Sequence, residues 1–227
     1  YNVTDSSGNV ATQKTRTVNV VDTTKPVITV SGSNPATVEV GSVYTDAGAT
    51  ASDNYDGNLT ASIVKTGTVN TSVVGSYTIT YNVSDASGNV ATQKTRVVNV
   101  VDTTAPVITI VGSNPVTVEA GSTYTDAGAT ASDNYDGNLT GSIVKTGTVN
   151  TAVLGSYTVA YNVMDAAGNP GLQKTRTVNV VDTAKPVITV LGENPVCVGL
   201  NSTYTDAGAT ASDNYDGNLT GSIVKTG

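Results

Sequence analysis

The sequence predicts an all-β protein made of tandem β-sandwiches arranged end to end. Tyr1, Tyr81 and Tyr161 begin three copies of one unit, and the 80-residue register continues along the chain without insertion or deletion. Apolar and polar residues alternate along several segments, and the 227 residues include no His, Trp or Phe. Strict repetition of strand-forming sequence predicts an array of modules, each with its own hydrophobic core.

We expect two complete repeats between two partial ones. The complete repeats are expected at residues 23–102 and 103–182, each opening within a VVDT linker. Residues 1–22 correspond to the C-terminal part of a repeat, and residues 183–227 to the N-terminal part. We interpret the chain as a window from a longer repetitive protein. The alternative is that two chains complete one split domain head to tail, which would omit the segment equivalent to Thr68–Thr80.

Period-two patterns predict the strands of each repeat. Turn signals lie at Ser31–Pro35, Asp56–Gly57 and Asp85–Asn89, which predicts about seven short strands per repeat and no free-standing helix. Val97 is Thr in the other copies and is expected to face water. The residues expected on the core face are Ile28, Val30, Val38, Val40, Tyr77, Ile79, Tyr81, Val83, Val98 and Val100.

Composition and charge exclude several classes of function. The net charge of −7 argues against a nucleic-acid partner, which would require clustered Lys and Arg. No apolar run approaches the roughly 20 residues needed to cross a bilayer, so we expect no membrane span in this segment. The sequence offers no histidine base and no nucleophile beside an oxyanion loop, so we expect no enzyme activity. Cys197 is the single cysteine and replaces a Thr of the other copies, which leaves an interchain disulfide as the alternative to a tolerated substitution.

Several separated motifs resemble one known family. The runs PVITVxGxNPxTVExGxxYTDAGATASDNYDGNLT, GSYTxxYNVxDAxGN and RxVNVVDTTxPVI occur in order along the chain. Together they resemble the bacterial immunoglobulin-like tandem repeats of surface and secreted proteins, which look similar to hyalin-type repeats. The resemblance covers the whole chain and implies immunoglobulin-like sandwiches in an extracellular or cell-surface setting. It does not specify a function, because such domains serve as spacers, stalks and accessory modules.

The acidic residues of each repeat are expected to meet beside the incoming linker. If the first strand of each repeat runs away from that end, the following strand returns and brings the Tyr44–Thr60 loop back. The Tyr77–Ser84 strand also returns and brings Asp85 with it. The carboxylates expected to converge form three groups: Asp22, Asp53, Asp56 and Asp85; Asp102, Asp133, Asp136 and Asp165; and Asp182, Asp213 and Asp216.

Calcium is the metal that these groups are expected to bind. Crowded carboxylates repel one another, and a hard cation with oxygen ligands compensates that repulsion. Gly57 permits the tight turn that would aim several oxygens inward. The spacing lacks the pattern of an EF-hand loop, so an alternative stays open in which the Asp and Asn side chains only cap loop amides.

The favoured function is an extracellular structural repeat, a stalk or fibre component with stiff junctions. Linkers such as residues 101–106 are short, lack Gly and end in Pro, which predicts stiffness even without metal. The expected partners are neighbouring repeats or copies of the chain along a fibre. The alternative is an adhesin or carbohydrate-binding array acting by avidity on surface glycans. Tyr44 and Tyr55 are its loop candidates, although we expect Tyr55 to pack against its own loop.

Overall fold

Residues 1–226 are described by a computed structural model of the protein, and they form two compact units. The first unit spans Tyr1–Asp102 and the second begins at Thr103. Strands dominate both units, and no helix within residues 1–226 is long and apolar enough to cross a membrane. The all-β class expected from the alternating sequence is confirmed.

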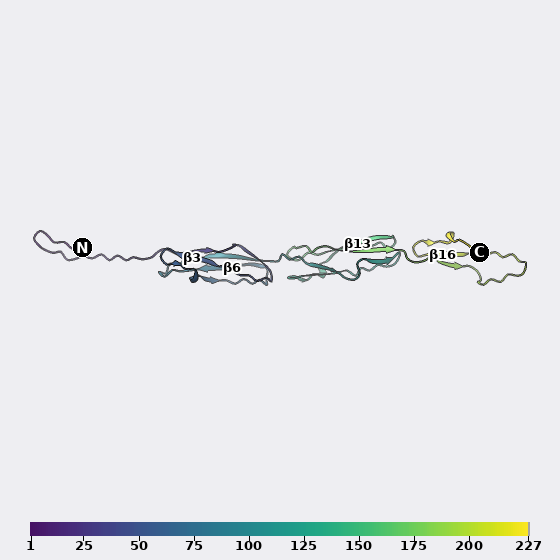
Figure 1. The fold of residues 1–227 in the computed structure, drawn as a ribbon, viewed down its shortest axis with the longest axis horizontal. Helices are drawn as coiled ribbons and strands as arrows, with labels where there is room; N and C mark the ends of the chain where they lie inside the picture. The colour runs from purple at the N-terminus through teal and green to yellow at the C-terminus, as the bar shows by residue number, and fades with distance from the viewer. Residues whose placement is uncertain (227) are drawn as a thin grey trace. The chain divides into compact units, whose positions relative to one another are not determined.

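The complete repeat of the first unit folds as two sheets, and its strands β3 and β6 are labelled in Figure 1. Within residues 23–102, all of which the structure describes, there are seven strands and one 3₁₀ turn, Thr60–Ser62. All pairings are antiparallel except β2 with β7. The three-stranded sheet has the order β1 (Val27–Val30), β3 (Ala49–Asp53), β4 (Gly57–Asn58), and the four-stranded sheet β2 (Ala36–Glu39), β7 (Lys94–Val101), β6 (Gly75–Asn82), β5 (Val64–Thr66).

The second unit repeats this topology because its sequence repeats the same alternation. Its sheets have the orders β8 (Val107–Ile110), β10 (Ala129–Asp133), β11 (Gly137–Asn138) and β9 (Val116–Glu119), β14 (Lys174–Val181), β13 (Gly155–Asn162), β12 (Val144–Thr146). The start of a further repeat follows as β15 (Val187–Val190), β16 (Ala209–Asp213) and β17 (Gly217–Asn218). The 3₁₀ turns Thr140–Ser142 and Thr220–Ser222 match the turn in the first unit.

The core of each complete repeat lies between its two sheets. Ile28, Ile79 and Val98 are at most 3% exposed, as the alternation predicts. Val97 lies on the outward face of the sheet, as expected, and its side chain is half-buried. It lies on the central strand β7 opposite Thr78, and cross-strand neighbours cover part of an outward side chain.

The partial repeats bury far less apolar surface. Ile188 on β15 is 61% exposed, whereas the equivalent Ile28 and Ile108 are 3% exposed. The segment around Cys197 forms no strand in the described structure, because no equivalent of β14 lies beside it, and the cysteine is exposed and free. Residues 1–22 hold one isolated bridge, Thr4 with Val10, and are almost entirely exposed.

A buried charged cluster occupies the core of each complete repeat, and the sequence analysis missed it. Arg96 is 2% exposed, and its Nε lies 3.1 Å from Asp46 Oδ1. The Tyr81 hydroxyl donates to the same oxygen at 2.7 Å, and Lys65 Nζ lies 3.4 Å from Oδ2. Burial raises the pKa of Asp46, but the bonds from Tyr81, Gly48 and Lys65 more than offset this and hold it below its usual range. The alternation along β7 could have predicted the burial of Arg96, because this residue lies on the same face of the strand as Val98 and Val100.

The guanidinium of Arg96 also fixes two loops. It donates to the carbonyl of Ser33 at 2.9 Å and of Gly48 at 3.1 Å, and to the carbonyl of Ser31. One side chain on β7 therefore satisfies backbone acceptors of the β1–β2 turn and of the loop before β3. Arg176 makes the corresponding bond to Gly128 at 3.1 Å in the second unit. Buried charge is tolerated here because each guanidinium is paired with an aspartate and donates to backbone carbonyls.

Arg96→Met is expected to destabilise the first unit by about 3–5 kcal/mol, because it leaves the buried Asp46 carboxylate without the buried cation that pairs with it. Urea unfolding of the full chain measures this loss. Lys65→Met is the control and is expected to cost no more than about 1 kcal/mol, since that ammonium is exposed. An equal effect of both substitutions would contradict the buried-pair account.

Stability of the second unit is expected to fall above pH 10. Burial and the bond to Asp126 raise the pKa of Tyr161 from 10.0 to about 12. The folded protein thus holds this proton more tightly than the unfolded chain. The contribution of Tyr161 to the free energy of unfolding is therefore complete below pH 10 and is lost as the pH rises toward about 12. Denaturant unfolding across this window should show a smaller loss in Tyr161→Phe than in the wild type. Identical pH dependence of the two proteins would show that ionisation of Tyr161 does not cause the loss of stability.

Candidate metal centre

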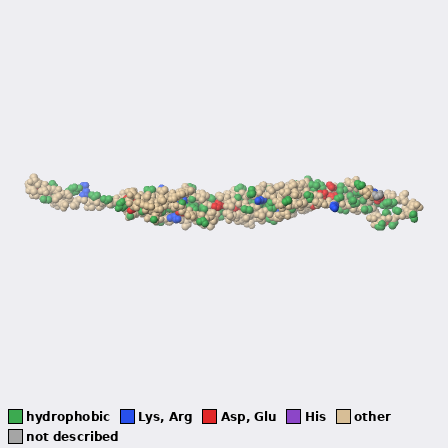
Figure 2. Space-filling view, in the orientation of Figure 1, with side chains coloured by type: hydrophobic (Ala, Val, Ile, Leu, Met, Phe, Trp, Pro, Cys, Tyr) green, Lys and Arg blue, Asp and Glu red, His purple; other side chains and the backbone are tan. Residues whose placement is uncertain are grey.

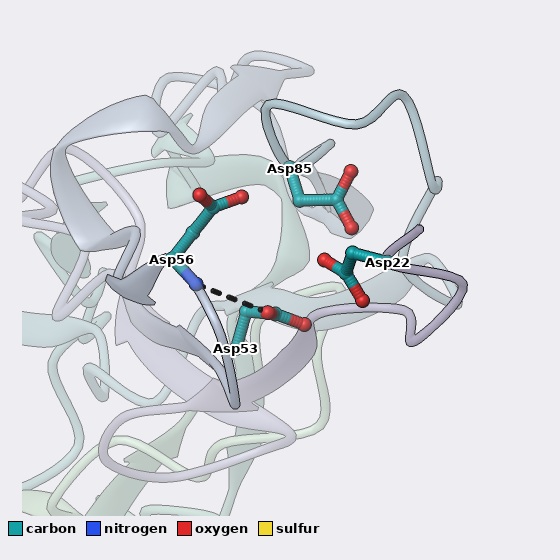
Figure 3. A group of neighbouring side chains, drawn as sticks. All are labelled: Asp22, Asp53, Asp56 and Asp85. Atoms are coloured by element: carbon teal, nitrogen blue, oxygen red, sulfur yellow. Dashed lines mark hydrogen bonds between the residues drawn. The ribbon is translucent and has the colours of Figure 1, made fainter. Parts of the chain in front are cut away.

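Four aspartates meet at the start of the first complete repeat, as Figure 3 shows. Asp22 lies in the linker before β1, Asp53 ends β3, Asp56 lies in the turn to β4, and Asp85 follows β6. One carboxylate oxygen from each lies within 4.8 Å of the others. Because β3 and β6 both run back toward the linker, strand direction brings together residues up to 63 positions apart in the chain.

Short local hydrogen bonds hold the β3–β4 turn in shape. Asp53 Oδ1 accepts from the amides of Tyr55 at 2.8 Å and Asp56 at 3.2 Å. Gly57 follows with a φ of 72°, a conformation that favours glycine. Asp56 Oδ2 in turn accepts from the amide of Ala86 at 2.8 Å, which joins this turn to the segment after β6. The turn-forming role expected of these residues therefore exists, and it uses only part of their oxygens.

Oxygens that face the centre of the group remain without hydrogen bonds. Asp22 Oδ2 and Asp53 Oδ2 are buried from solvent and have no hydrogen-bond partner, although Asp22 Oδ1 accepts from Thr24 N at 3.0 Å. A buried carboxylate oxygen without a donor is costly. A cation held between these atoms would remove that cost, so the donor set fits a metal ion.

Asp85 is the most buried member of the group at 7% exposure. Its two oxygens accept from the amide and the side chain of Asn89, each at 2.7 Å. Burial raises the pKa of Asp85, but hydrogen bonds from Asn89, Gly88 and Ser87 together outweigh burial and hold the pKa below its usual range. Asn89 also donates to the backbone carbonyl of Asp22 at 3.2 Å, which ties the linker to the site.

A second group forms within the second unit, where Asp182, Asp213 and Asp216 each place one oxygen within 4.8 Å of the others. Asp182 Oδ1 and Asp213 Oδ2 are buried and lack hydrogen bonds. Burial, and then the charges of Asp213, Glu119 and Asp216, raise the pKa of Asp182. The face in Figure 2 is mostly uncharged, with acidic side chains in small groups.

The remaining group stays a prediction from the sequence. Asp102 ends the first unit, while Asp133, Asp136 and Asp165 belong to the second. Inside the second unit these three repeat the local pattern of their counterparts. Asp133 accepts from Tyr135 N at 2.8 Å, Asp136 from Ala166 N at 2.7 Å, and Asp165 from Asn169 N at 2.7 Å.

Two further residues at the Asp182 group were not identified from the sequence. Glu119 accepts hydrogen bonds from the linker residues Thr183 and Ala184, and Asn214 donates to the carbonyl of Ala120 at 3.2 Å. The Thr183 hydroxyl, with amides of the same linker, lowers the pKa of Glu119 to about 2. One sequence feature could have drawn attention to Glu119: the last repeat has Gly199 at the equivalent position.

The two loop tyrosines behave differently from expectation. Tyr55 is 77% exposed, so the prediction that it packs against its own loop is wrong: the β3–β4 turn is held by Asp53 rather than by apolar packing. It lines an open cavity of about 580 Å³ together with Asn54 and linker residues. Tyr44 is half-buried and packs against the core.

The donor set has the chemistry of a hard-cation site. It consists of carboxylate oxygens, with a backbone carbonyl nearby, and includes no sulfur or imidazole. Such ligands suit Ca²⁺ or Mg²⁺ rather than Zn²⁺ or copper. Asp22, Asp53, Asp56 and Asp85 would hold the ion in the first unit, and Asp182, Asp213 and Asp216 in the second.

Comparison with known proteins finds several relatives. The chain is 35% identical over 247 aligned residues to an uncharacterized 81.3 kDa protein of Acholeplasma phage L2, covering 100% of this chain and 32% of that protein. It is 32% identical to hyalin of Strongylocentrotus purpuratus, covering 86% of this chain and 17% of hyalin. The chain thus spans a third or less of the length of these relatives.

Solved structures are more distant. The chain resembles a Clostridium perfringens ZmpB structure containing the M60 catalytic domain with the CBM51-1 and CBM51-2 domains. The likeness has a TM-score of 0.40 and 15% identity, and covers 92% of this chain and 35% of that one.

The family model described as bacterial surface protein, Ig-like domain, matches residues 28–100 and 108–180. These segments coincide with the two complete sandwiches, and they confirm the resemblance carried by the repeated motifs. Since they make up more than half of the sequence, the chain belongs to this family of bacterial surface proteins with Ig-like domains.

Proposed function

We propose that the chain is an extracellular structural array, part of a stalk or fibre, in which calcium rigidifies the joints between repeats. One observation carries this proposal: the linker residue Asp22 shares a compact carboxylate group with Asp53, Asp56 and Asp85 of the repeat that follows it. The group therefore joins a linker to a domain. Membership of a surface-protein family supports a location at the cell surface or outside the cell. The role is mechanical and not catalytic.

The proposed mechanism is a charge-controlled joint. Without a cation, the like charges at this site repel one another and favour movement of the linker away from the two loops. With calcium bound, the same charges hold the linker against the domain. Calcium fits this setting because it accepts six to eight oxygen ligands in flexible geometry, and extracellular modules bind it at about 10⁻⁴–10⁻³ M.

The linker itself adds stiffness. Asp22 is followed by Thr23, Thr24, Lys25 and Pro26, so the connection contains no Gly and ends in a residue with a fixed φ. A short linker of this kind has fewer backbone states than a Gly/Ser tether. Metal binding would therefore restrict a connection that is already limited in its motion.

Glycan binding by an adhesin array is the second candidate. The exposed Tyr55 beside an open cavity favours it, because sugars pack on aromatic faces. The equivalent loop in the second unit favours the structural role. There Asn214 donates to the carbonyl of Ala120, and Tyr215 is 38% exposed rather than 77%. The loop thus contacts a neighbouring repeat.

Calcium binding is expected to depend on Asp85 and not on Asp5. Both residues begin a D-x-S-G-N turn and accept the same bonds from an Asn four positions later, but only Asp85 lies in a carboxylate group. Isothermal titration should show that Asp85→Asn weakens calcium binding at the Asp22 group by at least roughly tenfold. Asp5→Asn should leave all sites unchanged. Absence of calcium binding by the wild-type chain would reject the calcium proposal.

Removal of calcium is expected to increase bending between repeats. Small-angle scattering of the chain in millimolar calcium and in excess chelator measures this change, and the chelated chain should give a broader distribution of maximum dimensions. The combined variant Asp22→Asn, Asp182→Asn should resemble the chelated wild type in both conditions. Scattering profiles that do not respond to chelator would count against the joint.

A further inference from the structure

Glu119 connects the end of strand β9 to the linker that follows β14. Its carboxylate accepts from Thr183 N at 3.0 and 3.2 Å, from Thr183 Oγ1 at 2.6 Å and from Ala184 N at 3.1 Å. These donors directly follow Asp182, the linker member of the second carboxylate group. One side chain therefore binds the backbone on the C-terminal side of a candidate metal ligand.

The register of the sheet places Glu119 at this point. Strand β9 pairs in parallel with β14, and Glu119 lies beside Val181, the residue before Asp182. A parallel neighbour ends at the same edge of the sheet as the outgoing strand, so its last side chain reaches the chain as it leaves the domain. The contact follows from strand order and requires no metal.

A second contact accompanies it. Asn214, in the loop between Asp213 and Asp216, donates to the carbonyl of Ala120 at 3.2 Å. Gly121 follows with a φ of 74°, and a Cβ at that position would lie 4.0 Å from the carbonyl oxygen of Asn214. The turn after β9 therefore touches both the linker and the metal-site loop of the next repeat.

The charge of Glu119 is informative. A fourth carboxylate beside Asp182, Asp213 and Asp216 adds charge repulsion to an acidic site. Such a carboxylate is tolerated only where hydrogen-bond donors of its own stabilise its negative charge. Here two amides and one hydroxyl of the linker supply that compensation. The bonds bring no donor to the aspartates, and they restrict the backbone that carries Asp182.

We infer that Glu119 is a metal-independent latch that fixes the linker and positions Asp182 for the site. It is a positioning residue and not a metal ligand. The metal part of this inference rests on the proposed function, whereas the latch itself does not. Gly199 stands at the equivalent position of the last repeat, so glycine is a substitution that the repeat itself contains.

The test compares Glu119→Gly and Glu119→Gln with Glu193→Gln, which removes an exposed glutamate in the next repeat. Spin labels at Val144→Cys and Thr210→Cys, in a Cys197→Ser background, report the distance between β12 and β16 by pulsed electron paramagnetic resonance. In chelator, Glu119→Gly is expected to broaden the distance distribution, Glu119→Gln to broaden it less, and Glu193→Gln to leave it unchanged.

Calcium titration provides the second readout. Glu119→Gly is expected to weaken the Asp182 site by roughly tenfold or more, as loss of an orienting partner does, while the Asp22 site keeps its affinity. If no site binds calcium but Glu119→Gly still broadens the distances, the calcium proposal fails and the latch stands. An unchanged distribution in chelator overturns the latch. Loss of calcium binding in Glu119→Gln with unchanged distances also overturns it, since Glu119 would then be a ligand.

Discussion

Mutual repulsion of carboxylates beside the linkers is the interaction on which the proposed role depends. Asp22, Asp53, Asp56 and Asp85 bring oxygens within 4.8 Å of one another, and two of these aspartates have buried oxygens without hydrogen bonds. Local bonds shape the loops that carry these residues, but they leave the inward oxygens unsatisfied. In the proposed role, repulsion between these carboxylates persists until a cation binds, and it acts where the linker meets the domain.

The same repeat contains another buried charge, and its own side chains and backbone compensate that charge. Arg96 is enclosed by Asp46, Tyr81 and three backbone carbonyls, so its charge is compensated within the domain. This cluster joins the four-stranded sheet to the β1–β2 turn and to the loop before β3. The core charge is therefore compensated within the domain, whereas the linker site keeps buried oxygens without hydrogen bonds. The proposed role assigns stability to the core and adjustable stiffness to the joint.

Repetition and alternation predicted the sandwiches, and strand direction predicted that Asp22 would meet Asp53, Asp56 and Asp85. The Arg96 cluster was missed because burial of a charged residue depends on partners from distant segments, such as Asp46 and Gly48, which alternation along one strand does not reveal. Glu119 could not be placed, since its role depends on the parallel pairing of β9 with β14, which alternation does not reveal. Tyr55 was misplaced because exposure of a turn residue depends on what covers the turn, and one repeat's pattern does not contain that information.

Anomalous diffraction from crystals of the chain grown with calcium, or with a lanthanide in its place, tests the central claim most directly. The account predicts a metal peak bounded by the carboxylates of Asp22, Asp53, Asp56 and Asp85, and another at Asp182, Asp213 and Asp216. Well-ordered carboxylates with no peak between them, or aspartates turned apart toward solvent, would contradict it.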